Sequence, residues 1–238
     1  MAPALLAGSR GNIGMNLTTV GDLLTTAGVS WAMYIPSSEE LRNPAAYVLH
    51  HRYGTDWTTR IFPDSQFDTD AAGCSSDSSC KLASVVWLET TSGNEHPPHT
   101  VAAGETWTAD RVNAVAINGY LWNNTLIFIL WDDFGGFYDH MAPTVDGQDW
   151  RNGFRVPMIC VGKYCKNQVN HTEFTFESAL KMVENMFANG ARLPGSLYDS
   201  TANDLGTGCL AGSSCTGHTG TGMVDLTLSN SPPPARPN

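Results

Sequence analysis

The amino-acid sequence predicts an α/β fold in which helices cover both faces of a mostly parallel sheet. Short runs of strand-forming residues alternate with amphipathic helical segments, and this alternation is typical of such layered folds. The chain has 238 residues, which is enough for one large domain with a substantial core. The clear strands are few, whereas a complete doubly wound domain normally has more.

The first predicted elements are a helix, a glycine stop and a strand within residues 17–35. Apolar residues recur at helical spacing between Val20 and Ala27, and Gly28 follows at a capping position. Residues 36–82 are rich in turn formers and aromatic side chains. We expect this segment to be irregular and to pack as a cap over the sheet.

The later elements follow from apolar runs and from helical periodicity. Apolar runs predict strands at residues 82–88, 125–130 and 156–161. Helices are predicted at residues 105–116 and 174–187, the second with one strongly apolar face. Composition then divides the chain into a domain of residues 1–208 and a tail of residues 209–238. The tail is rich in Gly, Ser and Pro, which is typical of a disordered segment or linker.

The charge balance limits the partners of the protein. The formal net charge is −10, with only 13 Lys and Arg residues, which argues against a nucleic-acid surface or a basic patch for anionic membranes. A small phosphate substrate is still compatible, because a metal ion can supply positive charge locally. No apolar run approaches the roughly 20 residues that span a bilayer. The start, MAPALLAGSRGNIG, lacks the features of a signal peptide.

The six cysteines fall into three close pairs, and local disulfides are the preferred interpretation. The pairs are Cys74 with Cys80, Cys160 with Cys165, and Cys209 with Cys215. Disulfides imply an oxidising compartment, so we expect a secreted or periplasmic protein. Zinc binding is the alternative, although CxxC spacing is absent and no histidine lies near the first two pairs.

The segment WDDFGGFYDH, residues 131–140, carries the clearest chemical signal. Asp132 and Asp133 directly follow the apolar strand of residues 125–130, and a glycine pair then allows a sharp turn. Charged groups at the carboxyl end of a strand lie where α/β folds place ligands and metals. Two buried acids would need compensation, and a cation would supply it. The alternative roles for the two acids are turn formation and helix capping.

Two histidines stand in positions that suit phosphate or metal binding. His96 belongs to the segment EHPPH, residues 95–99, where neighbouring prolines present the ring rigidly. His171 precedes the helix of residues 174–187, whose N-terminal end attracts anions. The alternatives are a surface loop for His96 and an exposed histidine before a helix for His171. The basic run His50-His51-Arg52 is a weaker candidate for a phosphate contact.

These residues together resemble a known family, the bacterial phosphoesterases of the phospholipase C and acid phosphatase A type, in the alkaline phosphatase superfamily. Four blocks spanning about residues 17–205 carry the resemblance in the expected order. They are TVGDLLTTAGVSWAMY, SGNEHPPHTVAAGETW, NNTLIFILWDDFGGFYDHMAP, and RVPMICVGKYCKNQVNHTEFTFESALKMVENMF followed by ANDL. The resemblance implies an α/β/α sandwich of the alkaline phosphatase type.

The resemblance also implies a function and roles for individual residues. The family hydrolyses phosphate mono- or diesters with a divalent metal ion, so the expected substrate is a phospholipid head group or a small phosphomonoester. Asp132 and Asp133 would be metal ligands. His96 would help to bind the phosphoryl group, and His171 matches a histidine near the site.

The chain departs from the family pattern at its start. Members of the family begin with a strand that ends in a Glu-Asn pair, followed by a Ser or Thr nucleophile, and nothing in MAPALLAGSRGNIGMN matches either element. We therefore expect the C-terminal two-thirds of the family fold, incomplete at the N-terminus, with weak or no activity as it stands. The alternative is a non-catalytic, secreted remnant of this fold that binds metal or phosphate.

Overall fold

The structure, a computed structural model, describes residues 6–7, 13–36, 43–91, 94–144, 152–166, 169–196 and 198–206. Among these residues the strands are β1 (Leu6–Ala7), β2 (Ile13–Gly14), β3 (Trp31–Tyr34), β4 (Ile61–Phe62), β5 (Val85–Leu88), β6 (Ile127–Leu130) and β7 (Met158–Val161). The α-helices are α1 (Val20–Thr26), α2 (Leu49–Tyr53), α3 (Asp56–Thr59), α4 (Phe67–Ala72), α5 (Val101–Ala116), α6 (Gly119–Asn124), α7 (Phe176–Phe187) and α8 (Tyr198–Thr201). The 3-10 helices are η2 (Pro44–Tyr47) and η3 (Asp64–Gln66).

Helix α1 begins and ends where its local sequence directs. Thr19 and Asp22 form a capping box, in which the Asp22 N–H donates to Thr19 Oγ1 and the Thr19 N–H donates to Asp22 Oδ2 at 2.7 Å. After the C-cap residue Ala27, Gly28 has a φ of +73°, a left-handed conformation that favours glycine. The predicted helix and its glycine stop are confirmed.

Strand β3 is the centre of a three-stranded parallel sheet with the order β4-β3-β5. Trp31 of β3 lies opposite Val85 of β5, and Met33 lies opposite Ile61 of β4. This sheet is formed by the predicted strand after α1, the predicted strand of residues 82–88 and a short strand that the sequence did not reveal. The molecule therefore has a mixed α/β fold with a small parallel sheet.

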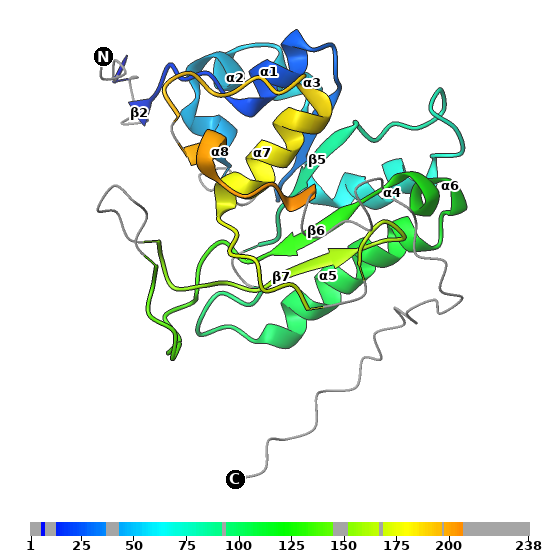
Figure 1. Ribbon diagram of the computed structural model, residues 1–238. Coiled ribbons are helices and arrows are strands. Elements are labelled where there is room, and N and C mark those ends of the chain that lie inside the picture. The colour runs from blue at the N-terminus through cyan, green and yellow to red at the C-terminus, as the bar shows by residue number, and fades with distance from the viewer. Residues whose placement is uncertain are drawn as a thin grey trace.

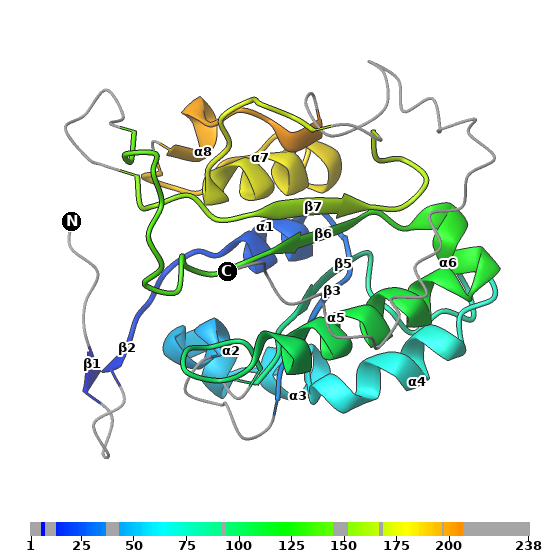
Figure 2. The same cartoon turned by 90° about the horizontal axis from the view of Figure 1, so that it is seen from below.

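The two faces of this sheet carry separate apolar clusters, because successive side chains of a strand point in opposite directions. On one face, Trp31 lies in a cluster with Leu24 of α1 and Phe187 of α7. On the other face, Tyr34 lies in a cluster with Phe67 of α4 and with residues of α5 and α6. Figure 2 shows α1 and α7 on one side of the strands and α4 and α5 on the other.

Strands β6 and β7 form a separate antiparallel ribbon, so the prediction of a mostly parallel sheet is wrong for this part of the molecule. Ile127 lies opposite Val161 in the register of the two strands. Figure 1 shows the ribbon between α7 and α5, and Met182 of α7 shares an apolar cluster with Phe128. Strand β6 is only partly buried, and Leu130 at its end is 43% exposed.

Residues 36–82 contain more regular structure than the sequence predicts. The described part of this segment holds η2, α2, α3, β4, η3 and α4. None of these elements is longer than six residues. Elements this short complete too few turns to produce a recognisable apolar period, which is why the segment looked irregular.

Two of the three predicted disulfides, Cys74–Cys80 and Cys160–Cys165, are present in the structure and confirm that part of the prediction. The third predicted pair, Cys209 and Cys215, lies outside the described residues. Stable disulfides form in oxidising compartments, and two of them are typical of an extracellular protein.

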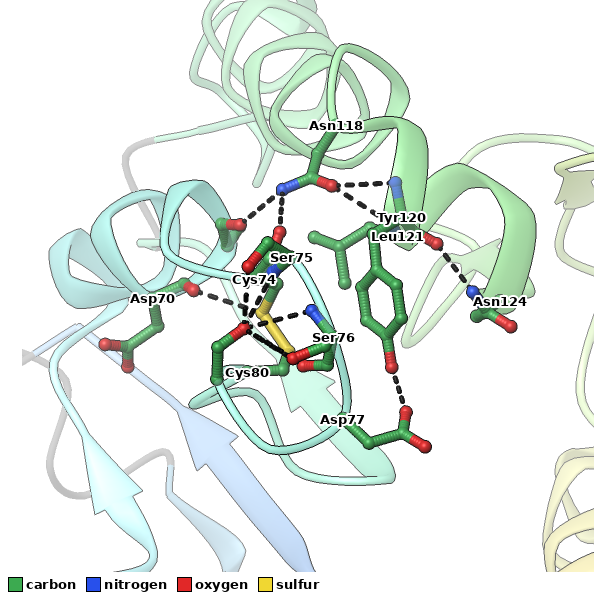
Figure 3. The surroundings of a disulfide bond; sticks show 12 residues. Asp70, Cys74, Ser75, Ser76, Asp77, Cys80, Asn118, Tyr120, Leu121 and Asn124 are labelled. Carbon is green, nitrogen blue, oxygen red and sulfur yellow. Dashed lines mark hydrogen bonds between the residues drawn. A yellow bond between two sulfur atoms is a disulfide. The ribbon is translucent and has the colours of Figure 1, made fainter.

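The loop closed by the first disulfide is held against the junction of α5 and α6 (Figure 3). The Asn118 side-chain amide donates to the backbone carbonyls of Ala71 at 2.9 Å and Cys74 at 2.8 Å. The same side chain accepts from the N–H groups of Tyr120 and Leu121 and so caps α6. One residue therefore fixes both the loop and the helix that leads into β6.

The predicted tail, residues 209–238, lies outside the described residues, so its separation from a domain of residues 1–208 stays a prediction. Within the ranges that the structure describes, no helix combines the length and the apolar character needed to cross a bilayer.

Candidate functional site

The chain leaves β6 through a tight turn, residues 131–136, which we call the strand-end turn. Both predicted metal ligands lie in it, and both are exposed. The Asp133 N–H donates to Asp132 Oδ1 at 3.1 Å, and the Gly135 N–H donates to Asp133 Oδ1 at 2.5 Å. Gly135 and Gly136 have φ values of +67° and +77°, which side chains rarely adopt. The two carboxylates therefore stabilise the turn that presents them.

The segment of residues 95–99, which we call the His-Pro segment, lies against this turn. The indole of Trp131 donates a hydrogen bond to the Glu95 carboxylate. A Cβ added to Gly135 would lie 3.6 Å from Pro97 Cγ, so the ring of Pro97 lies close to the backbone of Gly135. Burial raises the pKa of Glu95 despite the Trp131 hydrogen bond, which favours the charged form. Two segments that are 36 residues apart in the sequence, at Glu95 and Trp131, are thus in contact.

The Glu95 side chain can reach the strand-end turn because it passes α5 at Gly104, where the helix has no side chain. A Cβ on Gly104 would collide with Glu95 Cγ, so only glycine leaves room at this position. Glu95 itself has a φ of +71°, a left-handed conformation that is uncommon for a residue with a side chain. Such outliers concentrate at functional sites, where the surrounding structure holds them in place.

His96 is exposed beside these contacts. Its Nδ1 lies 2.8 Å from the carbonyl oxygen of Pro97. A carbonyl can only accept, so Nδ1 carries the proton in the neutral ring and Nε2 holds a lone pair. Nε2 can then accept a proton or bind a cation, and it can donate to a phosphoryl oxygen once the ring is protonated.

The segment that holds His171 is joined to the chain beyond the strand-end turn. The Thr144 hydroxyl donates to Glu173 Oε1 at 2.5 Å, and the Asn152 amide donates to Thr144 Oγ1 at 2.9 Å. The Asn203 amide donates to the Glu173 carbonyl at 2.8 Å. His171 lies two residues before Glu173 and is exposed. The structure thus connects its segment to the same end of the ribbon.

Asp139 has a strong partner that the sequence did not reveal. Arg155 donates to both carboxylate oxygens of Asp139. Its Nε lies 2.7 Å from Oδ2, and its Nη2 lies 3.0 Å from Oδ1. These hydrogen bonds lower the pKa of Asp139 to about 2. His140 Nδ1 lies farther away, 3.7 Å from the carboxylate. The Asp139 carboxylate therefore closes the loop after the strand-end turn by binding Arg155. No local signal in the sequence identified Arg155 as its partner.

The donor chemistry of the strand-end turn suits a hard divalent cation, since Asp132 and Asp133 offer carboxylate oxygens. Two residues supply only part of a coordination shell, and one oxygen of Asp133 already accepts from the turn backbone. In the described part of the chain, the His, Cys, Asp and Glu atoms that converge in groups of three or more do not include those of Asp132, Asp133, His96 or His171. The roles of these four residues stay predictions.

A group that does converge lies between α1 and α2 and consists of Asp22, His50 and His51, which we call the Asp22 cluster. His50 Nε2 lies 2.9 Å from Asp22 Oδ1, and His51 Nε2 lies 3.9 Å from Asp22 Oδ2. His51 is buried between Thr19 and Asp56, with Nε2 at 2.8 Å from Thr19 Oγ1 and Nδ1 at 2.8 Å from Asp56 Oδ2. The two histidines are visible in the sequence as a basic run, but their carboxylate partner is not.

A hollow of about 240 Å³ lies at the carboxyl ends of β3 and β4. Its lining is largely apolar and includes Ile35, Trp57 and Phe62. Ligands often bind at this edge of an α/β sheet. None of the predicted site residues lines the hollow, so we place no chemistry there.

Comparison with known proteins adds independent information. The chain matches the Phosphoesterase family over residues 8–189, a range that includes all four predicted site residues. It is 32% identical over 143 residues to non-specific phospholipase C4 of Arabidopsis thaliana, which covers 54% of this chain and 23% of that protein. It is 24% identical over 215 residues to the non-hemolytic phospholipase C of Pseudomonas aeruginosa, covering 73% of this chain and 30% of that protein. Phospholipase C B of Mycobacterium tuberculosis is 25% identical over 138 residues, covering 47% of this chain and 26% of that protein. The chain thus spans less than a third of the length of these relatives.

Proposed function

Because the chain belongs to the Phosphoesterase family, we propose that it is a hydrolase of phosphate ester bonds whose reaction centre is the strand-end turn with the His-Pro segment. The family match supports the reaction class, and the names of the relatives point to phospholipids as substrates. The complete fold would be the α/β/α sandwich of the alkaline phosphatase type.

One observation carries this proposal: the His-Pro segment docks on the strand-end turn. The Trp131 hydrogen bond to Glu95 and the approach of Pro97 to Gly135 support this proposal, because His96 lies between Glu95 and Pro97 in the chain. A phosphoryl group needs donors and cations around its oxygens, and these two segments offer both types of group.

In this proposal Asp132 and Asp133 hold a divalent metal ion through carboxylate oxygens. The bound ion would supply a Lewis acid that neutralises charge developing on the phosphoryl oxygens. His96, with Nδ1 fixed on the Pro97 carbonyl, presents Nε2 for proton transfer or hydrogen bonding. His171 lies before the positive end of α7 and favours binding of the anionic substrate.

The composition limits the class of substrate. A net charge of −10 disfavours polyanions such as nucleic acids, which leaves phospholipid head groups and small phosphomonoesters. Phe137 and Tyr138 are strongly exposed directly after the strand-end turn, and aromatic rings at such a position suit an amphiphilic substrate. The two disulfides fit a secreted or periplasmic enzyme.

A second candidate is a module of the same fold that binds metal or phosphate without turnover. It is favoured by the hydrogen bonds that Asp132 and Asp133 accept from their own turn.

Hydrolysis of p-nitrophenyl phosphate and p-nitrophenyl phosphorylcholine by the full chain, with and without added Mg²⁺, Ca²⁺, Mn²⁺ or Zn²⁺, tests both candidates. We expect metal-dependent turnover that falls about 100-fold or more in an Asp132→Asn/Asp133→Asn double variant. The matched control is Asp110→Asn, an exposed acid on α5. Metal or phosphate binding without turnover would favour the second candidate. Turnover that ignores both chelation and the double variant would refute the assigned site.

A further inference from the structure

The Asp22 cluster combines three potential ligands that the proposed phosphoesterase chemistry does not use. One ligand atom from each of Asp22, His50 and His51 lies within 4.8 Å of the others. His50 is the informative member. The capping box accounts for the position of Asp22, and hydrogen bonds to two partly buried partners account for the position of His51. Neither explains why a second imidazole also aims Nε2 at the same carboxylate, at 2.9 Å from Oδ1.

The tautomer of His51 is set by its buried surroundings. Its Nδ1 lies 2.8 Å from Asp56 Oδ2, and a carboxylate can only accept, so Nδ1 carries the proton. The Nε2 lone pair therefore faces Thr19 and Asp22. Asp56 is itself held by Arg60, whose Nε lies 2.9 Å from Oδ1. A histidine that is oriented through its other nitrogen by an anchored carboxylate is the usual arrangement around a metal ligand.

Thr19 allows the cluster to exchange a hydrogen bond for a cation without leaving a buried group unpaired. Its hydroxyl lies 2.8 Å from His51 Nε2 and 3.0 Å from Asp22 Oδ2. When a cation takes the Nε2 lone pair, the hydroxyl can donate to Asp22 instead. The other two ligand side chains are partly exposed, His50 at 39% and Asp22 at 30%, so an ion and a water molecule can reach the cluster from solvent.

We propose that Asp22, His50 and His51 bind a transition-metal ion of the zinc type, with water in a fourth position. Two imidazole nitrogens and one carboxylate oxygen are donors that zinc and its neighbours in the first transition row prefer, whereas Ca²⁺ and Mg²⁺ prefer oxygen donors alone. The ion would join α1 to α2 and so stabilise the packing beside Trp31, whose ring meets that of His51 edge-on with centroids 5.3 Å apart. This site is separate from the residues proposed for hydrolysis and does not depend on that function.

Calorimetric titration of the untagged full chain with Zn²⁺, after chelator treatment and alkylation of free thiols, tests the proposal. The background is the Asp132→Asn/Asp133→Asn variant, so that the result is independent of the strand-end turn. We expect one Zn²⁺ per chain and at least 10-fold weaker binding in His50→Gln and in His51→Gln. Binding should be 10- to 100-fold weaker in Asp56→Asn, which keeps all three ligands but weakens the contact that orients His51. The exposed His140→Gln is the matched control and should bind like the parent.

Thermal unfolding keeps the test decisive if the buried His51 variant fails to fold. Saturating Zn²⁺ should raise the melting temperature of the parent, because an ion that binds only the folded state stabilises it. The exposed His50→Gln variant should fold without metal and show little of this rise. Binding or stabilisation that is unchanged in His50→Gln, or no Zn²⁺ binding by the parent, would overturn the proposal.

Discussion

The three-stranded parallel sheet and the β6–β7 ribbon have similarly apolar sequences but differ in how well they are covered. Three of the four residues of β3 are buried, because α1 and α7 pack on one face and α4 to α6 on the other. No residue of β6 is fully buried, and Leu130 and Ile159 are 43% and 47% exposed. The difference shows that an apolar run is enough to specify a strand. How deeply the strand is buried depends on which other elements pack against it. The proposed reaction centre lies at the end of the less covered region.

The largest expected effect comes from truncating the same residue type in the two regions. Leu24 of α1 is fully buried against the parallel sheet, whereas Leu130 ends β6 at 43% exposure. Leu24→Ala should lower the free energy of unfolding by about 2–5 kcal/mol, through lost burial and the cavity left behind. Leu130→Ala should cost less than about 1 kcal/mol. Urea unfolding measures both, and equal losses would contradict the contrast between the regions.

A smaller effect is expected in α7, which packs on both regions. Glu184 and Asp199 are fully buried, and their Oε1 and Oδ1 atoms have no donor within the described structure. Burial raises the pKa of Glu184, Asp199 raises it further, and Arg192 opposes both. The folded state thus binds this proton more tightly than the unfolded state. Its stabilising contribution is complete at low pH and is lost as the pH rises through the raised pKa.

The Glu184→Gln variant should lose this part of the pH dependence, because glutamine resembles the protonated acid and cannot ionise. The wild-type free energy of unfolding should fall with rising pH by about 1 kcal/mol for each unit by which the pKa is raised. Urea unfolding between pH 4.5 and pH 8 measures the slope. Glu177→Gln on the same helix is the control and should keep the wild-type profile, and a Glu184→Gln profile parallel to the wild type would refute the assignment.

The smallest effect is expected at the ion pair of Asp139 and Arg155, of which only the arginine is exposed. Arg155→Gln should return the pKa of Asp139 from about 2 towards its ordinary range, as measured by NMR titration of the carboxyl group. A lowered pKa contributes stability at neutral pH that is lost only as the pH falls through about 2. Because Arg155 is exposed and solvent screens the pair, the melting temperature at pH 7 should change little. A large drop would show that the loop after the strand-end turn supports the core.

Local signals in the sequence predicted the elements that local interactions build. The glycine stop at Gly28 and the apolar face of α7 each lie within a few residues of the chain. The antiparallel pairing of β6 and β7 was missed, because strand direction depends on distant segments. The short helices of residues 36–82 were missed because they are too brief to show a period.

The candidate site divides in the same way. The acids and histidines were visible as residue types at suggestive places, and the family match covers all of them. The contact of Glu95 with Trp131 could not be predicted, because it depends on a left-handed backbone at Glu95 and on bare backbone at Gly104. The Asp22 cluster was missed because Asp22 and His50 are separated by 28 residues, and no local pattern in the sequence spans that distance.

Gly104 has a consequence for how stability and function are balanced in this chain. Alanine there would make α5 a better helix by about 1 kcal/mol, since glycine inside a helix is intrinsically unfavourable. Glycine is nevertheless present, because a methyl group at this position would displace the Glu95 side chain, which accepts a hydrogen bond from Trp131. Selection for a more stable helix would therefore favour alanine at position 104, whereas selection for the proposed reaction centre would favour glycine.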